Sequence, residues 1–438
     1  MLSSHDSELC GRDPAIRGLE TLLDPELLGL EVARAGRSLP ITHFIPSYLR
    51  YKPGTNCIVG FSSPNSPRTI AFYGKAYSRD TGKPKKSSPV DSSRGRIILD
   101  SQGIELFIFP SDARLDLRNA QQGNPPSQGR LDGHDEGFGT ALVPSITTLA
   151  YRPERRCVFA KNAGEDNGEV IKAYSPKEFS RTWSGARAFK NSGSSLFPAL
   201  LSADEDSRHL IFPWSPGEQL QQSLEQDCAS LACFVRAGEQ LAAVHHVDVE
   251  ALPFRSNAEE ADHLIQTAAM IGRVCPDLSD ASAAAAKKIA WQLLKMPCGS
   301  STLHGDFGAK QVISSGQSVA FLDYDEAARG NPAADLGNFI ARLEADALLG
   351  IIRTELVAPV QAALLGGYES AARLPPQAEL RLYTCVGLFR AALEPFRRHD
   401  PEWPLGMRRF INHVNSVLEG CVDPGAIEAE HTVRLASQ

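Results

Sequence analysis

Residues 304–314 read "HGDFGAKQVIS", and this stretch decides the fold that the sequence predicts. It places a carboxylate, Asp306, five positions before a side-chain amide, Gln311. Twelve residues after the amide, Asp323 opens a turn behind the apolar triplet "AFL". Carboxylate and amide oxygens that leave coordination positions open for water suit Mg²⁺ better than Zn²⁺. The pattern therefore predicts a magnesium site in a loop between short strands.

The residues that follow this loop indicate a catalytic motif and not a chance occurrence of the His-Gly-Asp tripeptide. An isolated His-Gly-Asp tripeptide is common and says little by itself. Here it is followed by the metal-binding pattern and then by "GNPAADLGN" at residues 330–338. Phosphoryl transfer requires a metal on the phosphates, a cation beside them and a carboxylate that orients the attacking hydroxyl. The combined motifs therefore predict a phosphoryl-transfer centre.

The order of these motifs resembles that of the aminoglycoside phosphotransferase and choline kinase superfamily. The shared pattern is His-Gly-Asp-x-x-x-x-Gln, then Ile/Leu-Asp-x-Asp, then Gly-x-Pro-x-x-Asp-Leu-Gly. The resemblance covers roughly residues 143–420, and the specific motifs lie within 304–338. It implies a protein-kinase-like fold and the activity of a small-molecule kinase that uses Mg²⁺ and ATP or GTP.

The resemblance also implies roles for the residues of the loop. Asp306 resembles the catalytic base that orients the substrate hydroxyl. Gln311 and Asp323 resemble the Mg²⁺ ligands. Gln311 stands where the superfamily usually has Asn, so the metal or the loop is expected to shift by about 1 Å. Three further residues are expected to support the loop: His304, Asp325 and Asp335.

A second group of residues is expected to bind the nucleotide. Lys172 resembles the lysine that contacts the phosphates, and Phe212 and Trp214 fall where the hinge meets adenine. A helix follows Lys172, with Ser175 as its N-cap. Its Glu178 is the candidate acidic partner of Lys172. No G-x-G-x-x-G motif precedes the lysine, so the usual phosphate loop is not expected.

The N-terminal part repeats itself. Three segments return later in the same order: "YKPGTNCIV" (51–59) as "YRPERRCVF" (151–159), "GKAYS" (74–78) as "IKAYS" (171–175), and "LFIFPSDARL" (106–115) as "HLIFPWSPGEQL" (209–220). This order predicts a duplicated β-sheet of about seventy residues. The first copy lacks the helix after its lysine, so Lys75 is expected to have a structural role.

The predicted fold is α+β and bilobal, with a β-rich N-lobe, a mainly helical C-lobe and an N-terminal cap-like extension that contains the degenerate sheet. The expected divisions are an extension at 1–120, a linker at 121–142, the kinase-like N-lobe at 143–211, a hinge at 212–220 and the helical lobe at 221–438. Apolar residues recur at three- and four-residue spacing beyond the hinge, which is typical of helices.

The composition indicates which partners and which cellular compartment to expect. The 438 residues carry a net charge of −7, which argues against nucleic acid as the partner. Nine cysteines occur without a C-x-x-C pair, as expected of reduced thiols in the cytoplasm. Neither a signal peptide nor a membrane-spanning run is predicted. The oligomeric state is left undetermined by the sequence.

Three functions remain open at this point. The first is phosphorylation of a small-molecule hydroxyl on an aminoglycoside, sugar, aminocyclitol or amino alcohol. The second is phosphorylation of Ser or Thr in a peptide natural-product precursor, with the N-terminal domain as a leader-peptide platform. The third is a pseudokinase-like binding module, which the missing glycine loop and Gln311 favour and the intact Asp306 and Asp323 oppose.

Overall fold

The computed structural model describes residues 2–79, 95–118, 146–165, 167–316 and 318–420. The predicted linker at 121–142 lies outside these residues. The chain divides into two compact units, described separately below. The first unit comprises Met1–Trp183, Ala199–Trp214 and Arg397–Pro401, and the second comprises Ser184–Pro198, Ser215–Phe396 and Glu402–Gln438. The break after Trp214 falls within the predicted hinge, while the other predicted domain limits stay predictions.

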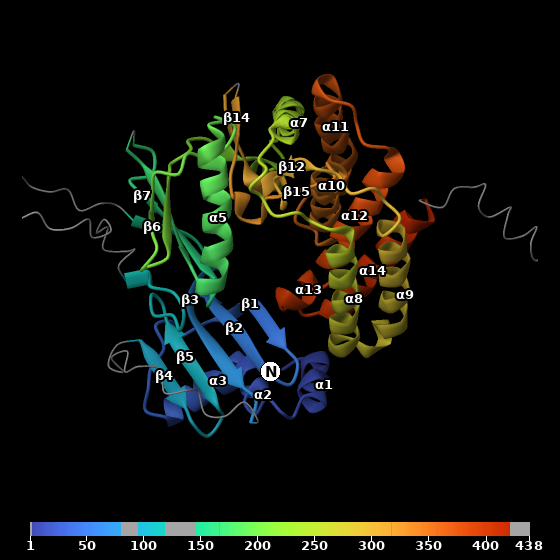
Figure 1. Cartoon of the computed structure of the whole chain (residues 1–438). Helices are drawn as coiled ribbons and strands as arrows, with labels where there is room; N and C mark the ends of the chain where they lie inside the picture. Colours follow the sequence, from blue (N-terminus) through green and yellow to red (C-terminus); the bar gives the residue numbers. More distant parts are fainter. Residues whose placement is uncertain (1, 80–94, 119–145, 166, 317, 421–438) are drawn as a thin grey trace, which may run out of the picture. The chain divides into compact units, whose positions relative to one another are not determined.

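The first unit contains two antiparallel sheets (Figure 1). The first has the order β1-β2-β3-β5-β4, with strands Ile45–Lys52, Asn56–Ser63, Ser66–Tyr77, Ile104–Ile108 and Arg96–Leu99. The second has the order β6-β7-β8-β10-β9, with strands Ile146–Arg152, Arg156–Lys161, Glu169–Tyr174, His209–Pro213 and Ser202–Asp204. Tyr51 pairs with Cys57 in one sheet, and Tyr151 pairs with Cys157 in the other. The identical order and matching register confirm the predicted repeat.

Helices accompany each sheet. Three short helices precede the first sheet: α1 (Ser4–Arg12), α2 (Leu19–Leu23) and α3 (Pro25–Arg34). Leu22 on α2 fills the space above Gly74 of β3, where a Cβ would lie 2.4 Å from its Cδ1. In the second sheet, α5 (Pro176–Ser192) follows β8, as predicted from the sequence.

An aspartate fixes the first hairpin turn of each sheet. Asp13 accepts hydrogen bonds from the Tyr51 hydroxyl at 2.6 Å and from the Gly54 backbone N–H at 2.8 Å. Asp112 accepts the corresponding bonds from Tyr151 at 2.6 Å and from Glu154 at 2.9 Å. In each sheet the aspartate therefore lies 38 or 39 residues before the tyrosine that it binds.

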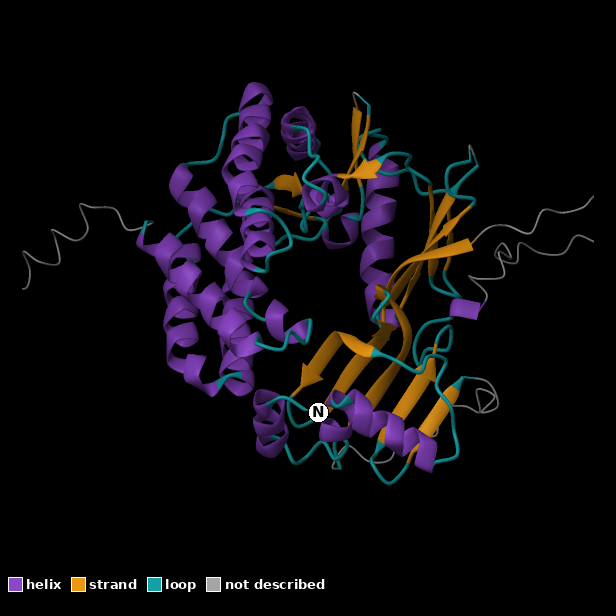
Figure 2. Ribbon diagram, turned by 180° about the vertical axis from the view of Figure 1, so that it is seen from behind, coloured by secondary structure: helices purple, strands orange, loops and turns teal. Residues whose placement is uncertain are grey.

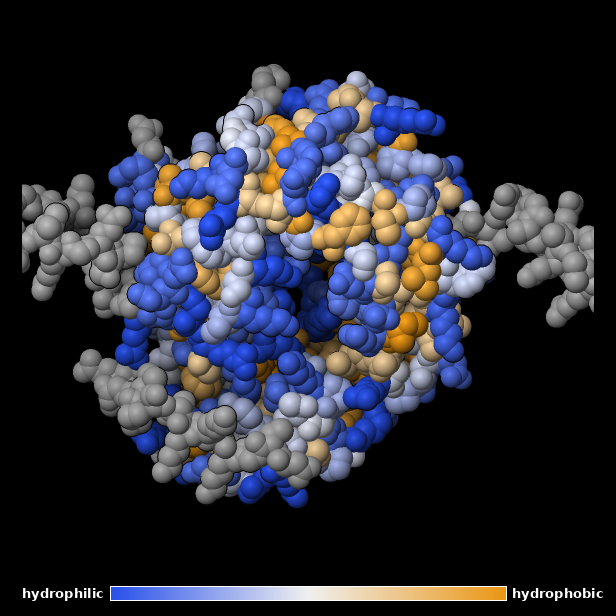
Figure 3. Space-filling model, in the orientation of Figure 1, coloured by the Kyte–Doolittle hydropathy of each residue, from blue (hydrophilic) through white to orange (hydrophobic). Residues whose placement is uncertain are grey.

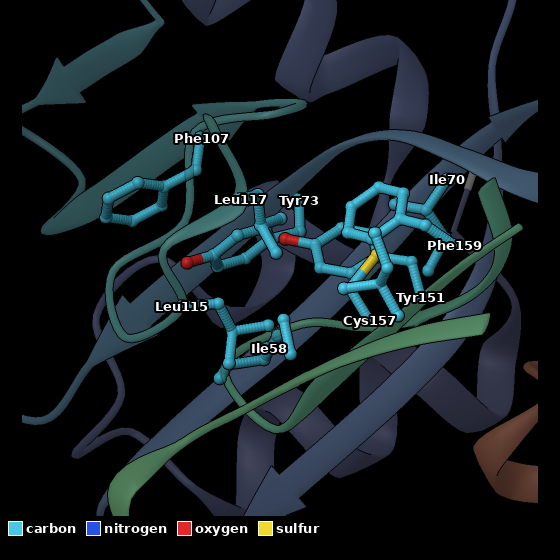
Figure 4. Packing of buried hydrophobic residues seen from close by; sticks show 11 residues of the cluster. Ile58, Ile70, Tyr73, Phe107, Leu115, Leu117, Tyr151, Cys157 and Phe159 are labelled. Carbon is cyan, nitrogen blue, oxygen red and sulfur yellow. The ribbon is translucent and has the colours of Figure 1, made fainter. Parts of the chain in front are cut away.

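The two sheets share one hydrophobic cluster (Figure 4). Ile58 and Tyr73 come from the first sheet, whereas Tyr151 and Cys157 come from the second. The rings of Tyr73 and Phe107 stack with centroids 4.8 Å apart. Burying one large apolar side chain contributes about 1.5–3 kcal/mol. The extension and the second sheet are therefore stabilised by a common core.

Helices make up most of the second unit (Figure 2). They are α6 (Leu220–Glu225), α7 (Leu231–His246), α8 (Asn257–Val274), α9 (Ser279–Leu293), α10 (Ala333–Leu348), α11 (Val357–Ala371), α12 (Gln377–Ala391), α13 (Glu394–Arg397) and α14 (Trp403–Glu419). Glycines allow close helix contacts: a Cβ on Gly238 of α7 would lie 2.1 Å from the Leu364 carbonyl of α11. The mixed strand and helix content confirms the predicted α+β class.

Short strands interrupt these helices around the candidate site. Strand β12 (Ser301–Leu303) pairs with β15 (Ala328–Gly330). Strand β13 (Val312–Ser315) pairs with β14 (Ser318–Phe321) and with β11 (Glu218–Gln219). These strands position the loop that contains Asp306.

The surface mixes hydrophilic and hydrophobic residues over the face drawn in Figure 3. No helix in the described part of the chain combines the length and the apolar character needed to cross a membrane.

Candidate active site

The loop after β12 is fixed by the first turn of α10. Asp335 on that turn accepts hydrogen bonds from the backbone N–H groups of His304 at 2.6 Å and Gly305 at 2.8 Å. Gly305 has a φ of +85°, and a Cβ there would lie 1.9 Å from the Glu326 carbonyl. Only glycine fits this tight approach. The backbone that leads into Asp306 is therefore set by one buried carboxylate.

Asp335 belongs to a buried polar chain. His245 at the end of α7 contacts its Oδ2 through Nε2 at 3.1 Å and the Tyr368 hydroxyl through Nδ1 at 2.9 Å. Burial alone would raise the pKa of Asp335, but the hydrogen bond and charge of His245 hold it below its ordinary value. From the sequence, helix-end packing explains His245 as well as substrate binding does. Nothing local in the sequence connects it with Asp335.

The ring of His304 lies inside the loop. Its Nε2 is 2.8 Å from the Leu322 carbonyl, and its ring centroid is 4.5 Å from that of Tyr324. The side chain is fully buried. His304 therefore joins the loop to the segment that leads into Asp323.

Gln311 and Asp323 flank the same end of the β13–β14 hairpin. Val312 pairs with Phe321, and the Leu322 N–H donates to the Gln311 carbonyl at 2.8 Å. The Gln311 Oε1 atom is buried and has no hydrogen-bond partner among the described residues. Asp323 adopts a left-handed backbone with a φ of +66°. An unpartnered buried oxygen at this position fits a ligand for a hard cation.

Within the described residues, no three His, Cys, Asp or Glu side chains gather into a metal site. Asp325, the predicted helper, is buried in the short 3₁₀ turn Tyr324–Glu326. Mg²⁺ usually takes one or two carboxylates and completes its shell with water and phosphate oxygens.

Three residues on one face of α10 hold the loop. Asn338 and Arg342 lie three and seven positions after Asp335, which places all of them on the same side of a helix. Asn338 donates to the Phe307 carbonyl at 2.8 Å. Arg342 donates through Nη2 to Oδ1 of Asp306. Sequence reasoning missed Asn338 and Arg342, although their helical spacing from Asp335 is a usable signal.

The residues predicted to bind nucleotide lie in the first unit. The Lys172 ammonium on β8 is 5.5 Å from the ring centroid of Phe212 on β10. The Trp214 N–H donates to the Gly168 carbonyl at 2.8 Å, so the end of β10 is tied to the β7–β8 turn. Glu178 accepts two hydrogen bonds from Arg155, at 2.7 and 3.0 Å. The structure thus pairs Glu178 with an arginine.

Part of the chain, including the loop with Asp306, matches the model of a known protein family. Residues 187–379 match the phosphotransferase enzyme family. The match spans less than half of the 438 residues, and it includes Asp306, Gln311, Asp323 and Asp335. It confirms the predicted resemblance and the predicted enzyme class, a phosphotransferase. Lys172 and Glu178 lie outside the matched segment.

Solved structures of phosphotransferases show a low similarity. A choline/ethanolamine kinase family protein from Mesorhizobium loti is 14% identical, with a TM-score of 0.47 over 64% of this chain and 89% of that chain. A thermostable mutant of the aminoglycoside phosphotransferase APH(4)-Ia is 17% identical, with a TM-score of 0.45 over 64% and 96%. The macrolide 2'-phosphotransferase MphH from Brachybacterium faecium is 17% identical, with a TM-score of 0.41 over 63% and 90%. Values this low carry no weight for substrate or mechanism, and no curated protein matches the chain significantly.

Proposed function

We propose that the protein transfers the γ-phosphate of ATP to a hydroxyl group of a small molecule. The observation that carries this proposal is Asp306, held by Arg342 on a loop whose backbone is fixed by Asp335 and Asn338. Phosphoryl transfer depends on positioning and electrostatic stabilisation more than on covalent help from the protein. Asp306, a carboxylate held by a hydrogen bond, and Gln311, whose amide oxygen is unpartnered five residues later, suit that need.

In this proposal Asp306 accepts the hydrogen of the attacking hydroxyl. Its side chain is 33% exposed, so an acceptor can reach it. Arg342 binds Oδ1, and the acceptor hydroxyl would therefore meet Oδ2. A carboxylate whose orientation is fixed in this way aligns the hydroxyl oxygen with the phosphorus atom.

Gln311 and Asp323 would hold Mg²⁺, which when bound neutralises charge on the nucleotide phosphates. By resemblance, Lys172 would contact the phosphates of a nucleotide, and Phe212 and Trp214 would border its adenine. Glu178 keeps its role only by resemblance, since the structure pairs it with Arg155. Use of GTP in place of ATP and a location in the cytoplasm remain predictions of the same kind.

The test is release of ADP across a panel of acceptors. The panel contains aminoglycosides, sugars, aminocyclitols, amino alcohols and Ser/Thr peptides, each with ATP or GTP. We expect one small-molecule class to stimulate ADP release, and Asp306→Asn to abolish it. Asp227→Asn is the matched control, because Asp227 also pairs with an arginine, Arg353 at 2.6 Å, but is exposed. Unchanged turnover in the Asp306 variant would show that the assignment is wrong.

The two alternative functions are outcomes of the same panel. Stimulation by peptides alone would identify a peptide kinase. Metal-dependent binding of ATP without ADP release for any acceptor would identify a binding module. Either result would overturn the proposed small-molecule activity.

A further inference from the structure

Arg342 has an unused hydrogen-bond donor beside the catalytic loop. Its Nη2 is engaged by Asp306, while its Nε is buried and has no partner in the described part of the chain. Its side chain is 43% exposed as a whole, although Nε itself is buried. A buried N–H without an acceptor is energetically unfavourable. Such a group in a site calls for a ligand that supplies the acceptor.

The unpartnered donor of Arg342 and the unpartnered acceptor of Gln311 both lie close to Gly308. A Cβ built on Gly308 would lie 3.3 Å from Gln311 Oε1 and 3.6 Å from Arg342 Nε. The same Cβ would lie 2.8 Å from Arg342 Cδ, so a larger residue would displace the arginine. Gly308 therefore leaves room for Arg342 to bind Asp306, the proposed catalytic base, while its Nε lies close to Gln311, the proposed metal ligand.

Arg342 stays positively charged in this position. Burial alone would lower its pKa, but Asp306, followed by Glu394 and Asp346, raises it. These three carboxylates come from the loop, from α13 and from α10 itself. A permanent cation bound to the hydroxyl-orienting carboxylate and close to the proposed metal ligand would stabilise negative charge that develops on a transferring phosphoryl group.

We propose that Arg342 is a further catalytic residue, which donates its Nε–H to an oxygen of the transferring phosphoryl group while Nη2 holds Asp306. The proposal rests on the proposed function. In the step, the acceptor oxygen forms a bond to the γ-phosphorus as the bond from that phosphorus to the β–γ bridging oxygen breaks. ADP leaves with the electron pair, and the hydroxyl proton passes to Asp306. Arg342 loses no proton and compensates charge at the moment of transfer.

The alternative is that Arg342 only tethers Asp306. Arg342→Lys keeps a cation that can bind Asp306 but removes the guanidinium fork, whereas Arg342→Met removes both functions. Arg353→Met is the matched control, since Arg353 forms an ion pair with Asp227 at the surface of the same unit. Removing one donor to a transition state lowers kcat by about 10²–10³. We expect a loss of kcat of this size for Arg342→Met and a smaller loss for Arg342→Lys. Neither variant should change KM appreciably, and the control Arg353→Met should leave both kcat and KM unchanged.

Two readouts separate catalysis from tethering. ADP with aluminium fluoride mimics the transferring phosphoryl group, and AMP-PNP mimics the ground state. We expect Arg342→Met to weaken the binding of ADP with aluminium fluoride by about 30-fold or more and to leave the binding of AMP-PNP unchanged. Free guanidinium should restore part of the turnover of Arg342→Ala. Neither binding measurement requires a known acceptor, so both remain decisive if the acceptor panel fails.

Three results would overturn the proposal. One is wild-type or faster turnover in Arg342→Met, which would mark the ion pair as inhibitory. Another is equal weakening of both nucleotide complexes together with a lower Tm, which would mark a structural role. The third is a wild-type protein that binds the fluoride complex no better than Arg342→Met does. By contrast, wild-type protein that releases no ADP with any acceptor overturns the proposed function and not the role of Arg342 in binding the fluoride complex.

Discussion

Lys75 and Glu154 form a buried ion pair of 2.8 Å although 79 residues separate them in the sequence. Lys75 occupies the position in the first sheet that Lys172 occupies in the second. Its ammonium is bound by a glutamate in the first hairpin turn of the second sheet. Arg50 also contacts this glutamate, at 3.2 Å. The lysine of the first copy therefore joins the two copies, as its expected structural role requires.

We predict that Glu154→Gln strongly destabilises the first unit. Glu154 is 1% exposed and Lys75 is 10% exposed, so the variant leaves a buried ammonium without its counter-charge. Loss of one partner from a buried pair costs about 3–5 kcal/mol. Urea unfolding measures the change. The control is Glu169→Gln, because the Lys161–Glu169 pair at 3.0 Å is partly exposed and is expected to contribute at most about 1 kcal/mol. Similar losses in both variants would contradict the prediction.

Asp335→Asn should affect stability, whereas Asp306→Asn should affect turnover alone. The first variant weakens the acceptors of the His304 and Gly305 N–H groups and removes the charge that faces His245. We expect a loss of about 2–4 kcal/mol, because several buried donors lose a charged partner together. Thermal and urea unfolding of both variants check this. A destabilised Asp306 variant would show that its ion pair with Arg342 is structural.

Gln311→Asn should be tolerated with an altered metal requirement. The shorter side chain withdraws its oxygen by about 1 Å from the position beside Gly308 that the glutamine reaches. We expect turnover within about tenfold of wild type at saturating Mg²⁺ and a higher Mg²⁺ concentration for half-maximal rate. Gln219→Asn is the control, since Gln219 is exposed and donates to the Lys310 carbonyl. Complete loss of turnover would show that the site is built around the longer side chain.

The first unit should lose stability as the pH falls below 7. Burial lowers the pKa of His209 from its ordinary value of 6.5, and its Nε2 lies 2.9 Å from the Asp116 carbonyl. The unfolded chain then binds the proton more readily than the folded chain, so protonation favours unfolding. This stabilising effect is present above the unfolded pKa and is lost as the pH falls through the lowered value.

The measurement is Tm against pH between about 7.5 and 5. His209→Gln should flatten the fall in Tm, because glutamine can bond to the Asp116 carbonyl without titrating in this range. His43→Gln is the control, since His43 is exposed in the same unit. An unchanged slope in the His209 variant would exclude this histidine as the cause.

Much of the candidate site could be predicted because its residues are close in sequence. Gln311 and Asp323 directly flank the β13–β14 hairpin, so local spacing alone brings them to one end of it, and Asp306 lies only five residues before Gln311. Asp335 lies on α10, the helix that follows, and its carboxylate accepts a hydrogen bond from Gly305 only 30 residues earlier in the chain. The repeat of the sheet could be predicted because similar segments recur in the same order along the sequence.

The other contacts of the site and of the sheets join residues that are far apart in the sequence. The sequence determined the class of fold, the phosphoryl-transfer motif and the duplicated sheet, because each depends on local periodicity or on spacing within one segment. Only the tertiary structure brought His245 to Asp335 across 90 residues, Lys75 to Glu154, and Arg342 to Asp306. A pairing of that kind depends on how whole helices and sheets pack. No single stretch of sequence contains both partners together with the packing that joins them.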